Sequence, residues 1–366
     1  MIDSALVYLG LMLIMMLFAW IGGKSKNYPY LWAAISSLAF GIVMGVRMHV
    51  GVDFDMYYNV YEGNKAGWFG GFGYNRWEPG FQLIYFLCSS QFLHYSIPFG
   101  IIAFLQIFLV FLGTRKLKEI WVFLPLTLFL CSTYISYNNI MRHMVAFSVF
   151  VFSIQYLADR KYWKYLLCII IAACFHKSAL TLIVLPLIYA WIPQIFTKIW
   201  PQLLLLAISL ILMNINLVQQ VFESISIVMS VLRYDGYMQT HYAEFDEKTG
   251  FGIRMVFIVA SMLIIIFFSK KIKAYYESRT VNIMYDLYII GMYIRFAFLK
   301  MFLIQRYNWF FMGFEFIVGA FALNYFAKKK EWIWLAVWIL MYLAVFFARL
   351  NIKDDGEVLY HAFFEY

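Results

Sequence analysis

The chain carries little charge for its length. Only 13% of its 366 residues are Asp, Glu, Lys or Arg, whereas 64% are hydrophobic, and about a quarter of the residues of a typical soluble domain are charged. This composition excludes an ordinary soluble globular protein. Cysteine is also scarce. The four cysteines lie in apolar runs and lack the spacing of a zinc site or a disulfide framework, so we expect neither of these. The sequence predicts no cofactor.

Proline is scarce as well. The seven prolines form no linker, and no internal repeat or low-complexity tract divides the chain. The sequence therefore predicts one integral membrane domain over residues 1–366, with sizeable external loops at about 47–79 and 215–252. The second loop contains the stretch VQQVFESISIVMSVLRY, whose apolar spacing suits either a helix lying in the membrane interface or a surface helix that closes the bundle.

Long uncharged stretches recur from one end of the chain to the other, and several reach the roughly 20 residues of a spanning helix. They include Ser4 to Gly23, Asn27 to Val46, Ile120 to Met141, Ser178 to Thr197, Ile199 to Phe222 and Trp332 to Ala348. The first lacks the basic start and cleavage site of a signal peptide, so we expect a retained helix. The sequence predicts an all-α polytopic membrane bundle of about 11 to 13 transmembrane helices.

Lysine and arginine exceed aspartate and glutamate by 29 to 20. In a membrane protein such an excess marks cytoplasmic loops rather than nucleic-acid binding, so we expect no nucleic-acid partner. The basic clusters are Lys24/Lys26, Arg115/Lys116/Lys118, Arg160/Lys161/Lys164, Lys270/Lys271/Lys273 and Lys328 to Lys330. From residue 114 onward, alternating helices return each cluster to one side of the membrane.

The first third of the chain does not fit this alternation directly. If Lys24 is cytoplasmic, the second helix places Arg47 outside, and two further crossings between Pro79 and Gly113 would place Arg115 outside too. Either one piece of that region enters the membrane without crossing, or residues 47–79 themselves cross. The sequence leaves both possibilities open.

Polar residues at the outer helix ends are the candidates for function, because charge inside a bilayer is costly and usually functional. Basic groups from five separate segments map to this side: Arg47, Arg142, His176, Arg295 and Arg306. Any one of them alone is explained by a side chain that reaches the headgroups. Together they indicate a shared anion site. The planar guanidinium binds phosphate oxygens bidentately, and a lipid-linked diphosphate needs both a bilayer and basic donors.

Other residues accompany this set. Asn139 lies on the same helical face as Arg142, His143 follows that arginine, and Lys177 follows His176. Glu315 is expected to be a structural partner of Arg295 or Arg306.

Three carboxylates lie in the first outer segment. Asp53 and Asp55 have the D-x-D spacing that many sugar transferases use for a divalent metal, although three residues make a weak signal. Glu78 precedes a proline at the entry to the next apolar run. Any of these carboxylates, or His176, can accept a proton from a sugar hydroxyl as a general base. The spacing does not select among them.

Four short motifs follow one another in a familiar order: RMHVGVDFDMY from Arg47, EPGF from Glu78, NNIMRHMVAFSVFVFS from Asn138 and IAACFHKSALTLI from Ile171. Over about residues 40–190 this order resembles the EpsG family, which is related to the Wzy-type polymerases of bacterial O-antigen, capsule and exopolysaccharide. The matching polar positions are Arg47, Asp53, Tyr57, Glu78, Asn139, Arg142 and His176. His143 departs from the glutamine that many family members carry there.

The resemblance implies a glycosyltransferase of the bacterial inner membrane with a GT-C-like fold. Its expected donor and acceptor are undecaprenyl diphosphate-linked oligosaccharides at the outer face, and its expected partners are membrane lipid, a flippase and a chain-length regulator. The candidate catalytic residues are Asp53, Glu78 and His176. The candidate substrate-binding residues are Arg47, Asp55, Tyr57, Asn139, Arg142, His143, Lys177, Arg295 and Arg306.

Other functions compete with this interpretation. A flippase or other transporter of lipid-linked sugars also needs a basic cavity, but it would place polar groups in both membrane halves and show internal repetition. A ligase that transfers finished polymer shares the chemistry and differs in its acceptor. A membrane O-acyltransferase is disfavoured, because no His-Asp pairing is evident.

Overall fold

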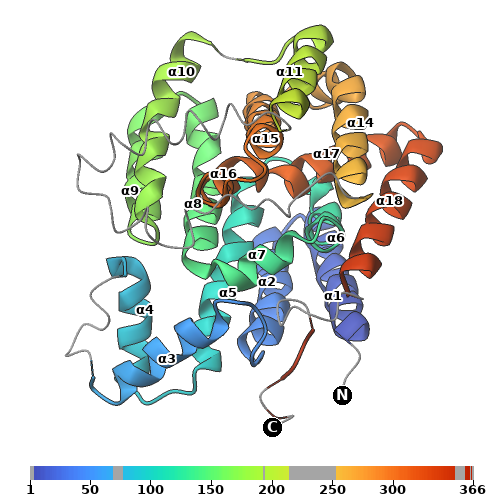
Figure 1. The fold of residues 1–366 in the computed structure, drawn as a ribbon. Coiled ribbons are helices and arrows are strands. Elements are labelled where there is room, and N and C mark those ends of the chain that lie inside the picture. The colour runs from blue at the N-terminus through green and yellow to red at the C-terminus, as the bar shows by residue number, and fades with distance from the viewer. Residues whose placement is uncertain are drawn as a thin grey trace. The chain divides into compact units, whose positions relative to one another are not determined.

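Figure 1 shows the fold in a computed structural model, which describes residues 4–68, 77–192, 194–213, 253–350, 359–362 and 364. Within these residues the regular elements are helices, and the β contacts are isolated bridge residues, such as the pair Arg47 and Ala362. The predicted all-α class is confirmed. The chain divides into two compact units: unit 1 comprises Met1–Trp191 with Gly319–Tyr366, and unit 2 comprises Ile192–Val318. The single integral domain stays a prediction.

Six stretches of the described residues are long and apolar enough to cross a membrane, so the chain is a multi-pass membrane protein. They are α1 (Ser4–Lys24), α5 (Ser96–Gly113), α8 (Met141–Ala158), most of α14 (Ile253–Tyr276), the stretch Ile304–Lys328, which contains most of α16 (Phe302–Met312) and all of α17 (Glu315–Lys328), and α18 (Trp332–Leu350). Shorter apolar helices lie between them, and the number of 11 to 13 spans stays a prediction.

The unresolved topology of the first third of the chain is settled by contacts at the two ends of α5. Helix α2 (Pro29–Gly45) packs along α5, and the Tyr95 hydroxyl, just before α5, donates a hydrogen bond of 3.0 Å to the Arg47 carbonyl, just after α2. At the other end, the Lys118 ammonium lies 3.4 Å from the Ser25 carbonyl that follows α1. Helix α5 therefore runs back from the Arg47 end to the Lys24 end.

The two helices that precede α5 begin and end on the same side of unit 1, because Arg47 before α3 and Tyr95 after α4 are hydrogen-bonded to each other. Helix α3 (Phe54–Lys65) is polar, and α4 (Pro79–Ser89) has 11 residues, a length of about 16 Å against a hydrocarbon core of about 30 Å. The two helices pack against each other, and α4 also contacts α5 (Figure 1). Of the two alternatives, the structure thus has a piece between Pro79 and Gly113 that does not span.

The remaining helices of unit 1 alternate between the same two ends. Helices α6 (Phe123–Leu130) and α7 (Thr133–Asn139) are joined at Ser132, whose φ of 58° breaks the helix. After α8, Asp159 forms ion pairs with Lys116 at 3.1 Å and Lys161 at 3.4 Å. Helix α9 (Tyr162–Ala173), the 3₁₀ helix η2 (Lys177–Val184) and α10 (Leu185–Trp191) follow.

The structure therefore gives unit 1 two chemically different ends. We call the end that carries Arg47, Glu78, Arg142 and His176 the arginine end, and the end that carries Lys24, Lys116, Lys118 and Lys328 the lysine end. The lysines of the second group line one hollow. The four basic clusters of unit 1 thus share one end, as the alternation predicted. The C-terminal segment returns to the arginine end, where the Met48 N–H donates to the His361 carbonyl at 2.8 Å.

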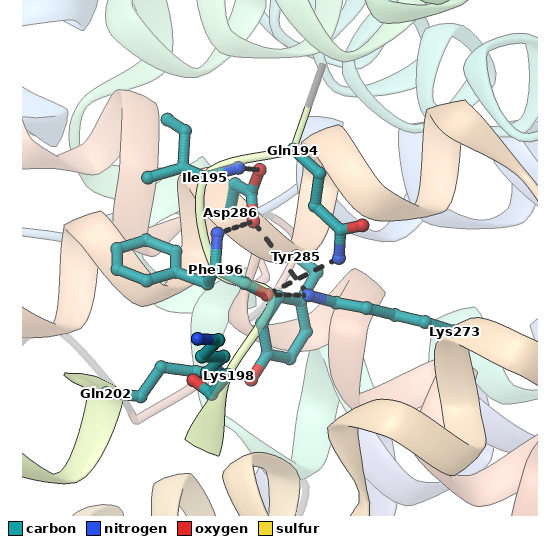
Figure 2. A network of polar contacts seen from close by, with 8 residues as sticks. All are labelled: Gln194, Ile195, Phe196, Lys198, Gln202, Lys273, Tyr285 and Asp286. Carbon is teal, nitrogen blue, oxygen red and sulfur yellow. Dashed lines mark hydrogen bonds and ion pairs between the residues drawn. The ribbon is translucent and has the colours of Figure 1, made fainter. Parts of the chain in front are cut away.

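A buried polar network fixes the start of α11 (Ile199–Leu212) within unit 2 (Figure 2). The carboxylate of Asp286, on α15 (Arg279–Ala297), is fully buried and accepts the N–H groups of Ile195 at 2.8 Å and Phe196 at 3.2 Å. The Lys273 ammonium donates to the Phe196 carbonyl at 2.5 Å and lies 4.0 Å from Asp286. A buried carboxylate is stable only with such partners, so this network holds the segment before α11 against α14 and α15.

Candidate active site

An aromatic core lies beneath the arginine end of unit 1. It is built from α3, α4, α5 and the start of α8, together with Trp77 shortly before α4 and Tyr95 just before α5, and it packs α3 and α4 against the longer helices. Its buried members are Phe54, Tyr57, Val60, Tyr61, Trp77, Phe81, Tyr85, Cys88, Tyr95, Phe99, Ile102, Met141 and Val145. Because aromatic side chains bury large apolar areas and pack in specific geometries, this core positions the polar groups at its edge.

The central polar contact is a buried ion pair between Glu78 and Arg142. Glu78 immediately precedes the proline that begins α4 and is 5% exposed. One of its oxygens accepts a hydrogen bond of 2.6 Å from Arg142 Nη1, and the other accepts the Lys177 N–H at 3.2 Å. The carboxylate thus joins α4, α8 and η2. Both charged residues were predicted as site residues from the sequence, but the ion pair between them was not predicted.

Arg142 has further features of an anion-binding group. Its guanidinium carbon lies 5.1 Å from the centre of the Trp77 ring, and Tyr57 is a polar neighbour. Its Nε is buried and has no hydrogen-bond partner in the described structure. Arg142 is also the second residue of α8, and the first N–H groups of a helix lack partners within it and attract anions. The guanidinium and the helix end add their positive charge at one place.

Two histidines lie next to this pair. His143 follows Arg142 on α8, is 2% exposed, and its ring centre lies 4.7 Å from that of His176. The Nδ1 of His176 lies 2.5 Å from the Ser178 hydroxyl, which orients the imidazole. Ser178 and Trp77 were not among the predicted site residues. Each is one or two residues away in the sequence from a predicted site residue, Glu78 or His176, and this proximity could have identified them.

A close backbone contact holds α4 in place. The Gly80 N–H donates to the Cys174 carbonyl at 2.7 Å, and a Cβ at position 80 would lie 2.8 Å from that same oxygen. Only glycine permits this approach. The contact fixes the distance between Glu78 and the turn that carries His176 and Lys177.

Arg47 has a different environment from Arg142, although both lie at the arginine end. It is 1% exposed, and its guanidinium donates to the carbonyls of Met44 at 2.6 Å, Val50 at 3.2 Å and Asn138 at 3.0 Å. Burial lowers its pKa to about 10, so it remains charged at neutral pH. The side chain joins the end of α2 to the end of α7. These contacts hold the two helix ends together, and the expected contact of Arg47 with substrate stays a prediction.

The other predicted site residues of unit 1 differ in their burial and in their contacts. Asp53 occupies the N-cap position of α3 and is half-buried, whereas Asp55 is exposed and pairs with His49 at 2.8 Å. Among the described residues, no three His, Cys, Asp or Glu side chains gather as a metal site would require. Asn139 ends α7, and its Oδ1 is buried and has no hydrogen-bond partner among the described residues. The Lys177 side chain is exposed.

Two predicted arginines belong to unit 2. Arg295, in the last turn of α15, lies 3.6 Å from Glu315, and both side chains are largely buried. This is the structural partnership expected for Glu315. Arg306 lies within α16. Residues 69–76 of the predicted external loop at about 47–79, and the predicted loop at about 215–252 with its amphipathic stretch, lie outside the described residues.

Comparison with known proteins assigns the family. The EpsG family model matches residues 30–366, nearly the whole chain, and so extends well beyond the four motifs at 40–190. Neither the curated proteins nor the solved structures provide a match. The buried pair and the two histidines lie within the matched region. The chain belongs to the EpsG family, which implies a function of the polysaccharide-polymerase type.

Proposed function

We propose that the protein is a glycosyltransferase that joins polyprenyl diphosphate-linked oligosaccharide repeat units into a polysaccharide. The observation that carries this proposal is the buried Glu78–Arg142 pair beside His143 and His176, at the ends of apolar helices. A lipid-linked donor needs its tail in the bilayer and its diphosphate at a cationic group near the membrane surface. The arginine end of unit 1 provides this combination.

The proposed donor is the growing chain on its lipid diphosphate. During transfer, the bond between the sugar C1 and the phosphate oxygen breaks, and the electron pair leaves with the diphosphate. Arg142 and the N-terminus of α8 stabilise the negative charge that develops there, because preorganised donors in a dry site are effective against such charge. Trp77 and Tyr57 hold the guanidinium in place.

The acceptor is a hydroxyl group of the incoming repeat unit. Its oxygen forms the new bond to C1, and its proton passes to a general base. We assign this role to His176, whose ring is oriented by Ser178, because both oxygens of Glu78 already accept hydrogen bonds from Arg142 and Lys177. Glu78 then positions Arg142. Asp53 is the alternative base, and His143 packs against the His176 ring.

The remaining predicted residues are proposed as secondary substrate contacts. Asp55, Asn139 and Lys177 lie in unit 1 on segments that flank the pair, and Arg295 and Arg306 lie in unit 2. Arg295 also forms an ion pair with Glu315 at 3.6 Å.

The proposed location is the bacterial cytoplasmic membrane, with the arginine end outside. Support comes from the lysine end, since lysine-rich ends face the cytoplasm in multi-pass proteins. Substrate would reach the outer face through a flippase, and a chain-length regulator would act on the product. The fold of the proposed enzyme is of the GT-C kind.

The test uses purified protein in lipid vesicles with a polyprenyl diphosphate-linked oligosaccharide, and polymer length is read on a gel. We expect Arg142→Ala to reduce turnover by about 100-fold or more, the effect of removing one transition-state donor, and His176→Ala to reduce it similarly. The matched control is Arg115→Ala at the lysine end, which should leave turnover unchanged. Wild-type turnover in Arg142→Ala would remove the leaving-group assignment.

The same assay separates the competing functions. A transporter would move the lipid-linked oligosaccharide across the vesicle without forming longer chains, and a ligase would form product only when a different acceptor is added. Either result would contradict the polymerase assignment.

A further inference from the structure

The lysine end of unit 1 contains a half-open hollow of about 620 Å³ that the proposed chemistry does not use. Its walls come from the last turns of α1 and α17 and from the segment between α5 and α6, which includes η1 (Lys118–Ile120). It lies at the opposite end of the helices from Glu78 and Arg142.

The charge of this hollow is strongly positive. Four lysines, Lys24, Lys116, Lys118 and Lys328, line it together with one acidic residue, Glu119. The Lys116 ammonium forms an ion pair with the Asp159 carboxylate at 3.1 Å, and the Lys118 ammonium donates to the Ser25 carbonyl at 3.4 Å. Lysines at helix ends are expected in cytoplasmic loops and by themselves indicate no ligand. Here, however, they come from separate segments and surround one space.

A close contact brings two of these segments together. A Cβ at Gly23 would lie 2.8 Å from the Lys118 carbonyl, so glycine at this position allows η1 to approach the end of α1. The approach brings the Lys118 backbone to the end of α1, and both Lys24 and Lys118 line the hollow. Like charges that line one space repel each other in the absence of a counter-ion, which favours an anionic occupant.

The surface that leads to the hollow is apolar and faces outward along α1. Leu6, Leu13 and Leu17 are 68%, 60% and 53% exposed, and Trp20 is 46% exposed. With Lys24 these residues recur at intervals of three, four or seven along the sequence, so they share one face of the helix. The face extends about 21 Å from Leu6 to Trp20, which exceeds the roughly 15 Å of one leaflet of the hydrocarbon core.

Trp20 connects the apolar face to the charged hollow. The Lys24 ammonium lies 4.1 Å from the centre of its ring, and both residues line the hollow. Tryptophan prefers the level of the lipid headgroups. The order along α1 is therefore acyl-facing leucines, a headgroup-level tryptophan and then the lysines.

We propose that this hollow is a binding site for an anionic glycerophospholipid, with the lipid phosphate among Lys24, Lys118 and Lys328 and one acyl chain along the Leu6–Trp20 face of α1. A lysine ammonium binds phosphate as a point charge, and basic pockets between transmembrane helices recognise acidic headgroups. A soluble phosphate ion would satisfy the lysines but would make no use of the leucine face. The structure therefore favours the lipid as the source of the phosphate.

The first experiment measures lipid binding to the purified full-length chain in detergent by native mass spectrometry. The probes are dioleoyl-phosphatidylglycerol, dioleoyl-phosphatidylcholine and inorganic phosphate at equal concentrations. We expect the phosphatidylglycerol to bind with an affinity that falls roughly 100-fold in the variant Lys24→Gln/Lys118→Gln/Lys328→Gln, since each lysine near the surface contributes about a fivefold factor.

The matched control is Lys26→Gln/Lys329→Gln/Lys330→Gln, which removes the same charge from neighbouring lysines outside the lining. It should retain wild-type affinity. Equal losses in the two variants would show a diffuse surface attraction and overturn the site. Equal binding of the phosphatidylcholine, or equal binding of inorganic phosphate alone, would overturn the anionic lipid as the ligand.

The second experiment needs no variant and so does not depend on the folding of the lysine substitutions. Phosphatidylglycerol with a photoactivatable group in its acyl chain is cross-linked to the wild-type protein, and the labelled peptides are mapped. Label concentrated between Leu6 and Lys24, and reduced by unlabelled phosphatidylglycerol, is the expected result. Label distributed evenly over the other exposed helices, such as α18, would contradict the proposal.

Discussion

A carboxylate and a guanidinium enclosed at a helix end stabilise each other only as a pair. Glu78 and Arg142 have side chains that are 7% and 17% exposed, and their closest atoms are 2.6 Å apart. Removing one member of such a pair leaves the other charge buried and unpartnered, at a cost of about 3–5 kcal/mol. The pair therefore contributes to the stability of unit 1 as well as to its proposed chemistry.

Glu78→Ala should lower the free energy of unfolding by about 3 kcal/mol, because Arg142 keeps its charge and loses its partner. The swapped variant Glu78→Arg/Arg142→Glu should regain part of this stability but remain inactive, since the guanidinium no longer lies at the end of α8. Thermal unfolding in detergent and polymer length measure the two effects.

The control for this prediction is Glu62→Gln on α3, which breaks a more exposed pair with Lys65 at 3.1 Å. A pair of this kind contributes less than about 1 kcal/mol. A loss at Glu62 as large as the loss at Glu78 would argue against burial as the reason for the effect.

Arg47 offers a separate prediction, because its guanidinium donates to three main-chain carbonyls. Lysine has no planar fork and cannot reach all three, so Arg47→Lys should lower stability by roughly 1–3 kcal/mol while the KM for the lipid-linked donor stays unchanged at low temperature. Arg115→Lys at the lysine end is the matched control. A raised KM with unaltered thermal unfolding would instead restore Arg47 as a substrate ligand.

At the scale of elements, the non-spanning helix α4 decides where Glu78 lies. It is too short to cross the membrane and is held by the aromatic core and by the contact between Gly80 and Cys174. The turn after α9 carries both this carbonyl and His176. Two segments almost 100 residues apart in the sequence thus form one wall of the site, as the hydrogen bond between Lys177 and Glu78 shows.

Gly80→Ala should separate these two segments, because the added Cβ meets the Cys174 carbonyl at 2.8 Å. We expect a loss of about 1–3 kcal/mol of stability and a large fall in polymer yield. Gly10→Ala in α1 is the control, since nothing lies within 4 Å of a Cβ there. Comparable activity in the two variants would show that the position of α4 does not matter for the reaction.

At the scale of the whole molecule, the distribution of charge predicts how the chain is oriented in the membrane. Within unit 1 the lysine clusters share one end, and the candidate active site lies at the other. Six long apolar stretches among the described residues fit a multi-pass protein, and the rule that positive loops stay inside predicts the orientation.

Cysteine labelling tests this orientation. Asp55→Cys and Lys177→Cys should react with a membrane-impermeant maleimide on intact cells, whereas Lys26→Cys and Lys330→Cys should react only in inverted vesicles. The other native cysteines are replaced, and the buried Cys88 is retained as a site that should stay unlabelled. Reaction of Asp55→Cys and Lys330→Cys from the same side would contradict the predicted topology.

The sequence by itself determined the class of the fold, the family and the two chemically different ends of unit 1. These follow from local properties. An apolar run of sufficient length must form its backbone hydrogen bonds within a helix when it lies in lipid. Lysine clusters at the ends of such runs indicate which side of the membrane each end faces. The four motifs of EpsG type are also local. For these reasons the grouping of Lys24 with Lys116, Lys118 and Lys328 could be predicted without coordinates.

Only the tertiary structure decided which polar groups meet. Arg47 and Arg142 are the same residue type at the same end, yet the first is enclosed by carbonyls and the second pairs with Glu78. Hydropathy and spacing cannot separate these cases, because burial and partners depend on how α3 and α4 pack against α5 and α8. The choice between structural and chemical roles is made by contacts between distant segments, and no single segment of the sequence contains that information.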